Sequence, residues 1–218
     1  MTRVIFLGLP GSGKGTQAAV AAEAAHIPHI ATGDIFRRHV REQTPLGKTA
    51  RQYMDRGENV PDDVTIAMVR DRLAAADAQP GFILDGFPRT LPQAEALDRL
   101  LGELDAPLEG ALYLKVDPEV VVRRMTGRRV CPKDGAVYHV ESNPPKVPGI
   151  CDLCGTPLIQ RADDHEEVAR HRLDVQWTQA QPLLPYYSSQ GKLREVDGLG
   201  DVAMVTARVM AALGLRAG

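Results

Sequence analysis

A segment near the start of the chain could bind phosphate; it reads Gly8-Leu9-Pro10-Gly11-Ser12-Gly13-Lys14-Gly15-Thr16. It lies between a short apolar run and a helical pattern, and the spacing Gly8-x4-Gly13-Lys14 is that of a P-loop. Glycines let the backbone curl so that successive N–H groups point at one phosphate, and the following helix N-terminus adds partial positive charge. The alternative is a plain glycine-rich turn between strand and helix. We expect the loop to bind a nucleoside triphosphate through Gly11, Ser12, Gly13, Lys14, Gly15 and Thr16.

One position departs from the usual P-loop. The residue after Lys14 is Gly15, where the pattern has Ser or Thr to hold Mg²⁺, and Thr16 follows one position later. Asp85 ends an apolar strand pattern, and the carboxyl ends of parallel strands form the ligand-binding edge of a sheet. Asp85 is therefore predicted to hold Mg²⁺ or one of its waters, with a capping role in the next turn as the alternative.

Several arginines have a spacing that suits phosphate chemistry. Arg124 and Arg128 are four residues apart and are predicted to share one helix face. Arg161 ends an irregular segment, and Arg172 lies in the helix that follows it. A guanidinium group is a planar fork that binds phosphate oxygens two at a time. Such a set could bring two polyanions together and spread the charge of a phosphoryl group in transfer.

The three cysteines all fall within residues 131–154 and have metal-ligand spacing. Cys131-Pro-Lys-Asp134 and Cys151-Asp-Leu-Cys154 would be a strong structural zinc signal if Asp134 were a fourth cysteine. A carboxylate oxygen is also an acceptable zinc ligand, so we expect a structural Zn²⁺ on Cys131, Asp134, Cys151 and Cys154. The alternative is a metal-free polar cluster. His139 is a reserve ligand, but a hydrogen-bonding role suits it better.

The elements that would position these residues alternate between strands and helices. Strands are predicted at residues 4–7, 27–30, 82–84, 111–116 and 193–196, and helices at 17–25, 65–76, 92–104, 118–125, 166–179 and 202–213. This alternation predicts an α/β fold with a five-stranded parallel sheet and helices on both faces.

Two segments interrupt the alternation. Residues 31–60 contain helical pieces without a convincing strand, and residues 127–164 are rich in Gly, Pro, Cys and Asp. Both are predicted to be insertions on a core made of residues 1–30, 61–126 and 165–218. The first is expected to be a helical acceptor-binding domain, and the second a small β-rich lid.

The motifs together resemble those of the adenylate kinases, within the P-loop nucleoside monophosphate kinases. The resemblance rests on Gly13-Lys14-Gly15-Thr16, Thr32-Gly33-Asp34-x-x-Arg37, Phe87-Pro88-Arg89-Thr90-x-x-Gln93 and Gly127-Arg128-Arg129-Val130. It continues through Tyr138-His139-Val140-x-x-Asn143-Pro144-Pro145-Lys146 and Arg161-x-Asp163-Asp164. The match covers essentially the whole chain in order, including the long lid of many bacterial members.

The resemblance implies reversible, Mg²⁺-dependent transfer of a phosphoryl group from ATP to AMP, giving two ADP, by a monomeric enzyme. It implies that Arg37 and Arg89 hold the AMP phosphate, that Arg124 contacts ATP, and that Arg128, Arg161 and Arg172 gather around the transferred group. Further AMP contacts are implied for Thr32, Glu58, Asn59, Val60, Gly86, Phe87, Pro88 and Gln93, and further ATP contacts for Val137, Tyr138 and Gly200. The amide of Gln93 offers a donor and an acceptor together, which complements adenine. Asp163 and Asp164 are expected to hydrogen-bond arginine side chains as the lid closes, or to cap the next helix.

Bulk composition limits the alternatives. The chain has 218 residues and a formal net charge of −2, which gives no general attraction for nucleic acid or an anionic membrane. The N-terminal apolar run is too short for a signal peptide, and a cytoplasmic location is expected. A kinase for another monophosphate, or one using GTP, is the nearest alternative. A nucleotide switch would need a guanine-reading Asn-Lys-x-Asp, which the sequence lacks, and the charge balance disfavours a zinc-ribbon nucleic-acid binder.

Overall fold

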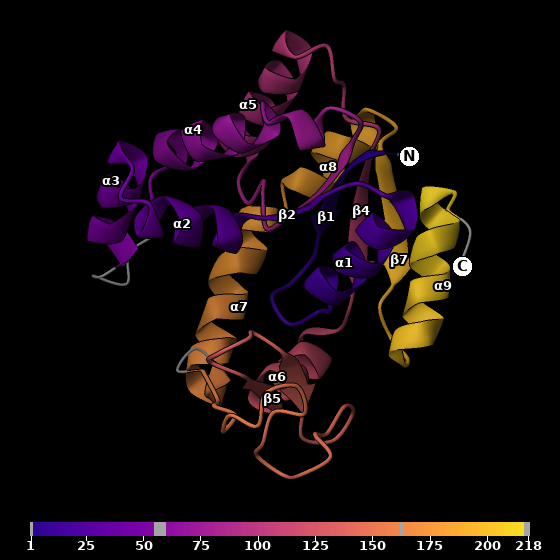
Figure 1. The fold of residues 1–218 in the computed structure, drawn as a ribbon. Helices are drawn as coiled ribbons and strands as arrows, with labels where there is room; N and C mark the ends of the chain where they lie inside the picture. The colour runs from indigo at the N-terminus through magenta and orange to yellow at the C-terminus, as the bar shows by residue number, and fades with distance from the viewer. Residues whose placement is uncertain (1, 55–59, 162–163, 216–218) are drawn as a thin grey trace.

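The computed structural model describes residues 2–54, 60–161 and 164–215, except for the side chain of Arg172. Five parallel strands form its central sheet in the order β2-β3-β1-β4-β7 (Figure 1). Their bounds are β1 (Arg3–Leu7), β2 (His29–Ala31), β3 (Phe82–Asp85), β4 (Gly110–Lys115) and β7 (Leu193–Asp197). The predicted five-stranded parallel sheet is therefore confirmed.

Side chains of β1 alternate between the two faces of this sheet, as a strand requires. Val4 and Phe6 pack in one buried cluster and Ile5 and Leu7 in another, so the strand is covered on both sides. The first cluster is closed by α1 (Lys14–Ala25) and α9 (Val202–Leu213). The second is closed by α4 (Asp62–Leu73), α5 (Leu91–Glu103) and α8 (Leu183–Ser189), and the short 3-10 helix η1 (Ala76–Ala78) follows α4.

The two predicted insertions are separate in space, with α2 and α3 at the left of Figure 1 and β5 at the bottom. Residues 31–60 contain α2 (Thr32–Arg41) and α3 (Pro45–Met54), and residues 127–164 contain the antiparallel pair β5 (Arg128–Val130) and β6 (Val137–His139). Two helices flank the second segment, α6 (Pro118–Thr126) and α7 (Glu166–Ala180), and they pack together through Val121, Met125, Ala169 and Leu173. None of the helices in the described part of the chain has both the length and the apolarity that crossing a membrane requires.

The predicted starts of two helices need correction. Helix α1 starts at Lys14 and helix α4 at Asp62, each three residues before the predicted start. In both cases, residues that we assigned to the preceding loop already form the first turn of the helix. Helix α8 was not predicted, and it contains Pro185. That proline lies in the first turn, where a missing N–H costs no intrahelical bond.

The predicted common helix face of Arg124 and Arg128 is wrong. Helix α6 ends at Thr126, and Arg128 opens strand β5, where it pairs with His139. Gly127 makes this pairing possible, because a Cβ there would lie 2.3 Å from Nε2 of His139. Asp164 is also not the cap of α7, whose N-cap position is His165.

Candidate active site

A cavity of about 720 Å³ lies at the carboxyl ends of the central strands, beside the glycine-rich loop. Predicted site residues from both insertions and from the sheet line this one cavity. They are Gly11, Ser12, Gly13, Lys14, Gly15, Thr16, Thr32, Asp85, Gly86, Pro88, Arg89, Arg124, Arg128, Val137, Tyr138, Arg161 and Gly200. Segments far apart in the sequence thus line one cavity.

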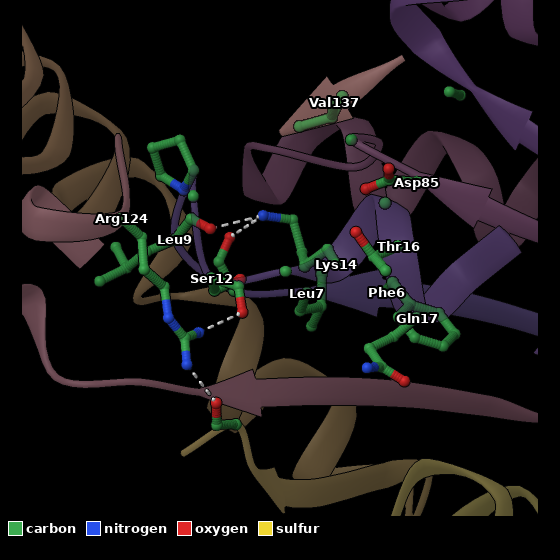
Figure 2. A pocket seen from close by; sticks show the side chains of 18 of the residues that line it. Phe6, Leu7, Leu9, Ser12, Lys14, Thr16, Gln17, Asp85, Arg124 and Val137 are labelled. Carbon is green, nitrogen blue, oxygen red and sulfur yellow. Dashed lines mark hydrogen bonds between the residues drawn. The ribbon is translucent and has the colours of Figure 1, made fainter. Parts of the chain in front are cut away.

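The glycine-rich loop has the backbone that phosphate binding needs. Gly13 has a φ of 99°, which favours glycine, and it is the N-cap of α1. Gly8 must also lack a side chain, because a Cβ there would lie 2.7 Å from the carbonyl oxygen of Leu114. The Lys14 ammonium curls back and donates to the carbonyl oxygens of Gly8 and Leu9, both at 2.7 Å (Figure 2). The lysine is therefore held over the loop.

Asp85 lies against the start of α1. A Cβ on Gly15 would be 3.3 Å from Oδ2 of Asp85, so the glycine that replaces the usual Ser or Thr leaves room for this carboxylate. On its other side, Nε2 of His29 is 3.6 Å from the same oxygen. Oxygen ligands of this kind suit Mg²⁺. The residues present therefore fit a magnesium ion that enters on the phosphates of a nucleotide.

Arg124 joins two loops of the cavity. Its guanidinium donates to the carbonyl oxygens of Ser12 and Gly198, both at 3.0 Å (Figure 2). Burial lowers the pKa of the Arg124 guanidinium from its usual value, but an arginine side chain stays charged in proteins at neutral pH. The arginine therefore brings a fixed positive charge to the base of the cavity.

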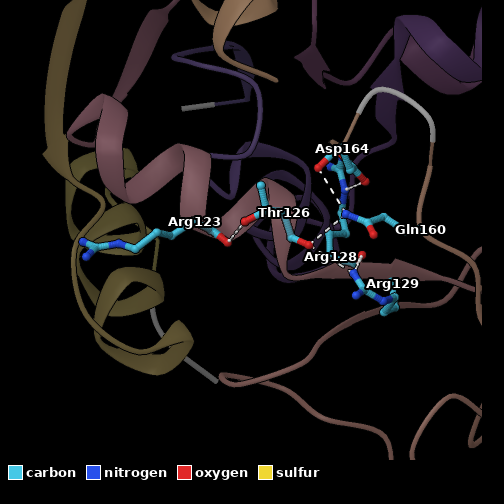
Figure 3. Close-up of polar contacts among 6 residues, drawn as sticks. All are labelled: Arg123, Thr126, Arg128, Arg129, Gln160 and Asp164. Atoms are coloured by element: carbon cyan, nitrogen blue, oxygen red, sulfur yellow. Dashed lines mark hydrogen bonds and ion pairs between the residues drawn. The ribbon is translucent and has the colours of Figure 1, made fainter. Parts of the chain in front are cut away.

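Arg128 makes a two-pronged ion pair with Asp164 (Figure 3). Its Nε donates to Oδ2 at 2.9 Å, and a second nitrogen donates to Oδ1. The side-chain amide of Gln160 adds two hydrogen bonds beside this ion pair, because it donates to the carbonyl oxygens of Thr126 and Asp164. The pairing joins the two ends of residues 127–164, and it agrees with the expectation that Asp164 hydrogen-bonds an arginine.

One side of the cavity is lined by residues of α2 and of the turn after β3. The Arg89 Nε donates to the carbonyl oxygen of Gly86 at 2.8 Å, which holds the arginine over the turn. Gly86 must be small, because a Cβ there would be 2.6 Å from Oγ1 of Thr32. Arg37 is exposed and pairs with Asp34.

Some predicted residues do not line this cavity. Phe87 and Gln93 are buried beneath it, and Val60 packs against the core. Glu58, Asn59 and Asp163 lie outside the described residues, as does the side chain of Arg172. Sequence reasoning missed Gly198 and Asp201 in the loop after β7, and Val202 at the start of α9, all of which line the cavity. The signal that could have found them is their place at the carboxyl end of a parallel strand.

A second group of functional side chains lies in residues 127–164. One ligand atom each from Cys131, Asp134, Cys151 and Cys154 lies within 4.8 Å of all the others. Two similar turns bring them together. In the first, Cys131 accepts from the N–H of Gly135 and donates to Ala136; in the second, Cys151 accepts from Gly155 and donates to Thr156. Asp134 therefore occupies in its turn the place that Cys154 occupies in the other.

The distances in this cluster fit a zinc ion. The sulfur atoms of Cys131 and Cys154 are 3.4 Å apart, and Sγ of Cys151 is 3.2 Å from Oδ2 of Asp134. Zinc–sulfur bonds of about 2.3 Å in a tetrahedron place sulfur atoms about 3.8 Å apart. Burial raises the pKa of the Cys131 thiol to about 11, and hydrogen bonds led by the one from Cys154 hold the pKa of Asp134 well below its usual value. His139 stays outside the cluster and accepts from the N–H groups of Glu141 and Ser142.

Comparison with known proteins gives a consistent result over nearly the whole chain. Residues 6–192 match the family model described as adenylate kinase. The chain is 54% identical over 211 residues to the adenylate kinase of Acidothermus cellulolyticus, covering 97% of each protein. It is 52% identical to that of Ruminiclostridium cellulolyticum, covering 98% of this chain and 100% of the relative. It is 53% identical to that of Streptomyces griseus, covering 97% of each.

Proposed function

The chain belongs to the adenylate kinase family and is a phosphotransferase, and from this premise we propose how its cavity converts ATP and AMP into two ADP. One observation carries the proposal. The P-loop residues and the acceptor-side residues Thr32, Gly86 and Arg89 line the same cavity, so two nucleotides can meet end to end within it.

At the donor end, ATP places its phosphates in the N–H groups of Gly11 to Thr16, and Lys14 moves from the loop carbonyls to the terminal phosphate oxygens. Adenylate kinases use Mg²⁺ with ATP, and the ion neutralises phosphate charge when bound. Asp85 is the carboxylate that would hold it or its water. Val137, Tyr138 and Gly200 would contact the rest of ATP from opposite sides.

At the acceptor end, Arg37 and Arg89 bind the AMP phosphate. That phosphate is already ionised at neutral pH, so the reaction needs no general base. It needs positive charge instead, which Arg124, Arg128, Arg161 and Arg172 supply around the transferred group. Thr32, Val60, Phe87, Pro88 and Gln93, with Glu58 and Asn59, would hold the nucleoside of AMP.

Closure of two domains would assemble this charge. Residues 31–60 would fold over AMP and residues 127–164 over ATP, against a core of residues 1–30, 61–126 and 165–218. Closure excludes water, which would otherwise accept the phosphoryl group. The ion pair between Arg128 and Asp164 lies where residues 127–164 leave and rejoin the core, so it is well placed to orient the closing lid.

We also propose that a structural zinc ion joins the two turns of the lid through Cys131, Asp134, Cys151 and Cys154. The segment has a small buried cluster of its own, formed around Cys131, Tyr138 and Cys151, and a metal would compensate for that small core. A monomer in the cytoplasm that binds no nucleic acid remains our expectation from the sequence.

A panel of acceptors tests the proposed reaction. ADP formation is measured from ATP with AMP, CMP, UMP or GMP, and from GTP with AMP. We expect ATP with AMP to be fastest, with two ADP formed for each ATP consumed. Faster turnover with a different acceptor or with GTP would overturn the assignment.

A further inference from the structure

Gln93 carries the adenine assignment, yet a free amide cannot tell adenine from a 6-oxopurine. Adenine offers an acceptor at N1 and a donor at N6, whereas hypoxanthine and guanine offer a donor at N1 and an acceptor at O6. A glutamine pairs with either pattern, since turning its amide by half a rotation exchanges the donor and the acceptor. Preference for AMP therefore depends on what fixes this amide.

Two neighbours fix it in the structure. Nε2 of Gln93 donates to Oδ1 of Asp62 at 2.6 Å, and Oε1 accepts from the backbone N–H of Arg89 at 2.8 Å. The Gln93 side chain is buried, at 6% exposure, so water cannot readily replace either partner. Each amide atom keeps some bonding capacity for a base, because the nitrogen has a second hydrogen and the oxygen a second lone pair.

These partners admit only one orientation of the amide. A carboxylate only accepts and a backbone N–H only donates, so the orientation follows from the chemistry of the neighbours. After a half rotation, Oε1 would face the Asp62 carboxylate and Nε2 would face the N–H of Arg89. Both contacts would then be repulsive in a buried place, where an unpaired polar group is costly.

Asp62 is itself held in place. The hydroxyl of Thr90 donates to its second oxygen, Oδ2, at 3.0 Å, and the same hydroxyl caps α5 by accepting from the backbone N–H of Gln93. Asp62 is the first residue of α4, where the helix dipole favours a negative side chain. The carboxylate therefore reaches from the start of one helix to the start of another in a fixed position.

We propose that Asp62 is a specificity-determining positioning residue, which locks the Gln93 amide in the orientation that pairs with adenine and opposes 6-oxopurine monophosphates. The inference rests on the proposed function, because it assumes that AMP binds beside Gln93. It adds that discrimination comes from a residue behind the base site, which acts by penalising the wrong amide orientation.

The test compares Asp62→Asn with Asp63→Asn. Both variants remove one negative charge from the first turn of α4, but Asp63 is exposed on the protein surface. The asparagine at 62 can turn its own N–H toward a flipped Gln93, which removes one of the two repulsive contacts. The substrates are AMP and inosine 5′-monophosphate, which differ at the C6 edge of the base. Their kcat/KM values are measured at saturating ATP, and their Kd values by calorimetry.

We expect Asp62→Asn to lower the ratio of kcat/KM for AMP to that for inosine monophosphate about tenfold, equivalent to about 1.4 kcal/mol. The KM for ATP and the ratio in Asp63→Asn should stay at wild-type values. A parallel loss for both acceptors would mean that Asp62 only supports the fold, and an unchanged ratio would also overturn the proposal.

Wild-type enzyme that shows no preference for AMP over inosine monophosphate would instead defeat the proposed function itself. If Asp62→Asn does not fold, Thr90→Val gives a second test. It frees one oxygen of Asp62 and is expected to lower the same ratio by a smaller factor. If folded Thr90→Val leaves the ratio of the two kcat/KM values unchanged, the proposed role of Asp62 in orienting the Gln93 amide is contradicted.

Discussion

Arg128 and Asp164 form a two-pronged ion pair whose acidic partner is completely buried. Arg128 opens strand β5 and Asp164 ends the segment 127–164, so the pair joins the two ends of a segment whose own buried cluster is small. The same guanidinium lines the candidate active site. One arginine therefore serves both the base of the lid and the cavity.

A double-mutant cycle measures that relationship. Asp164→Asn leaves the guanidinium without its full partner, and we expect it to lower the free energy of unfolding by about 1–3 kcal/mol, given that Arg128 retains some exposure. Arg128→Gln, Asp164→Asn and the double variant are unfolded in urea. The coupling between the two positions should exceed about 1 kcal/mol. Single effects that simply add would show that the pair is energetically unimportant.

Arg89→Ala tests the acceptor end. Loss of a charge-assisted, two-pronged phosphate contact should lower kcat/KM for AMP about a hundredfold or more, while the Tm changes by only a few degrees. The control is Arg99→Ala on α5, the helix that follows Arg89, where the side chain is exposed on the surface. Near-normal turnover in Arg89→Ala would remove this arginine from the mechanism.

The proposed zinc ion predicts one equivalent of bound metal and a Tm that falls when a chelator removes it. Asp134→Asn should lose the metal, because an amide cannot replace a charged oxygen ligand well, whereas Asp134→Cys should retain it. Asp152→Asn, in the other turn, is the control and should keep full metal content. Zinc is measured by atomic emission on the purified proteins. Wild-type protein purified without chelator and free of zinc would contradict the proposal.

Domain opening is predicted to limit turnover, because both insertions must separate before products leave. Rapid-quench measurements with ATP and AMP should then show that the first turnover is faster than the steady-state rate. A first turnover as slow as the steady state would mean that the chemical step limits the rate.

Local patterns in the sequence were enough to predict the sheet and most of its helices. Helix α9 was predicted over residues 202–213 and has those bounds, because Asp201 caps its start and Gly214 its end. The cluster of Cys131, Asp134, Cys151 and Cys154 was also predictable. The two residues of each pair are close in the sequence, so a single turn brings both side chains to the same place. Helix α8 was not, because it is short and depends on packing of Leu183 and Tyr187 against the sheet.

Features that depend on tertiary packing could not be predicted. Asp62 and Gln93 are 31 residues apart, and their contact exists only once α4 and α5 lie side by side. The separation of Arg128 from helix α6 depends in the same way on the pairing of Arg128 with His139, for which Gly127 leaves room. The residue types were enough to identify the chemistry of the site. Which side chains are held in place, and which neighbours hold them, depends on long-range contacts that the sequence does not reveal.

The central claim is that two nucleotides meet in one cavity, and the most direct test follows ATP consumption by purified protein with and without AMP. We predict that ATP is stable in the presence of Mg²⁺ alone and that AMP starts its conversion to ADP, two molecules for each ATP. Equal ATP consumption with and without AMP, releasing inorganic phosphate, would contradict the account.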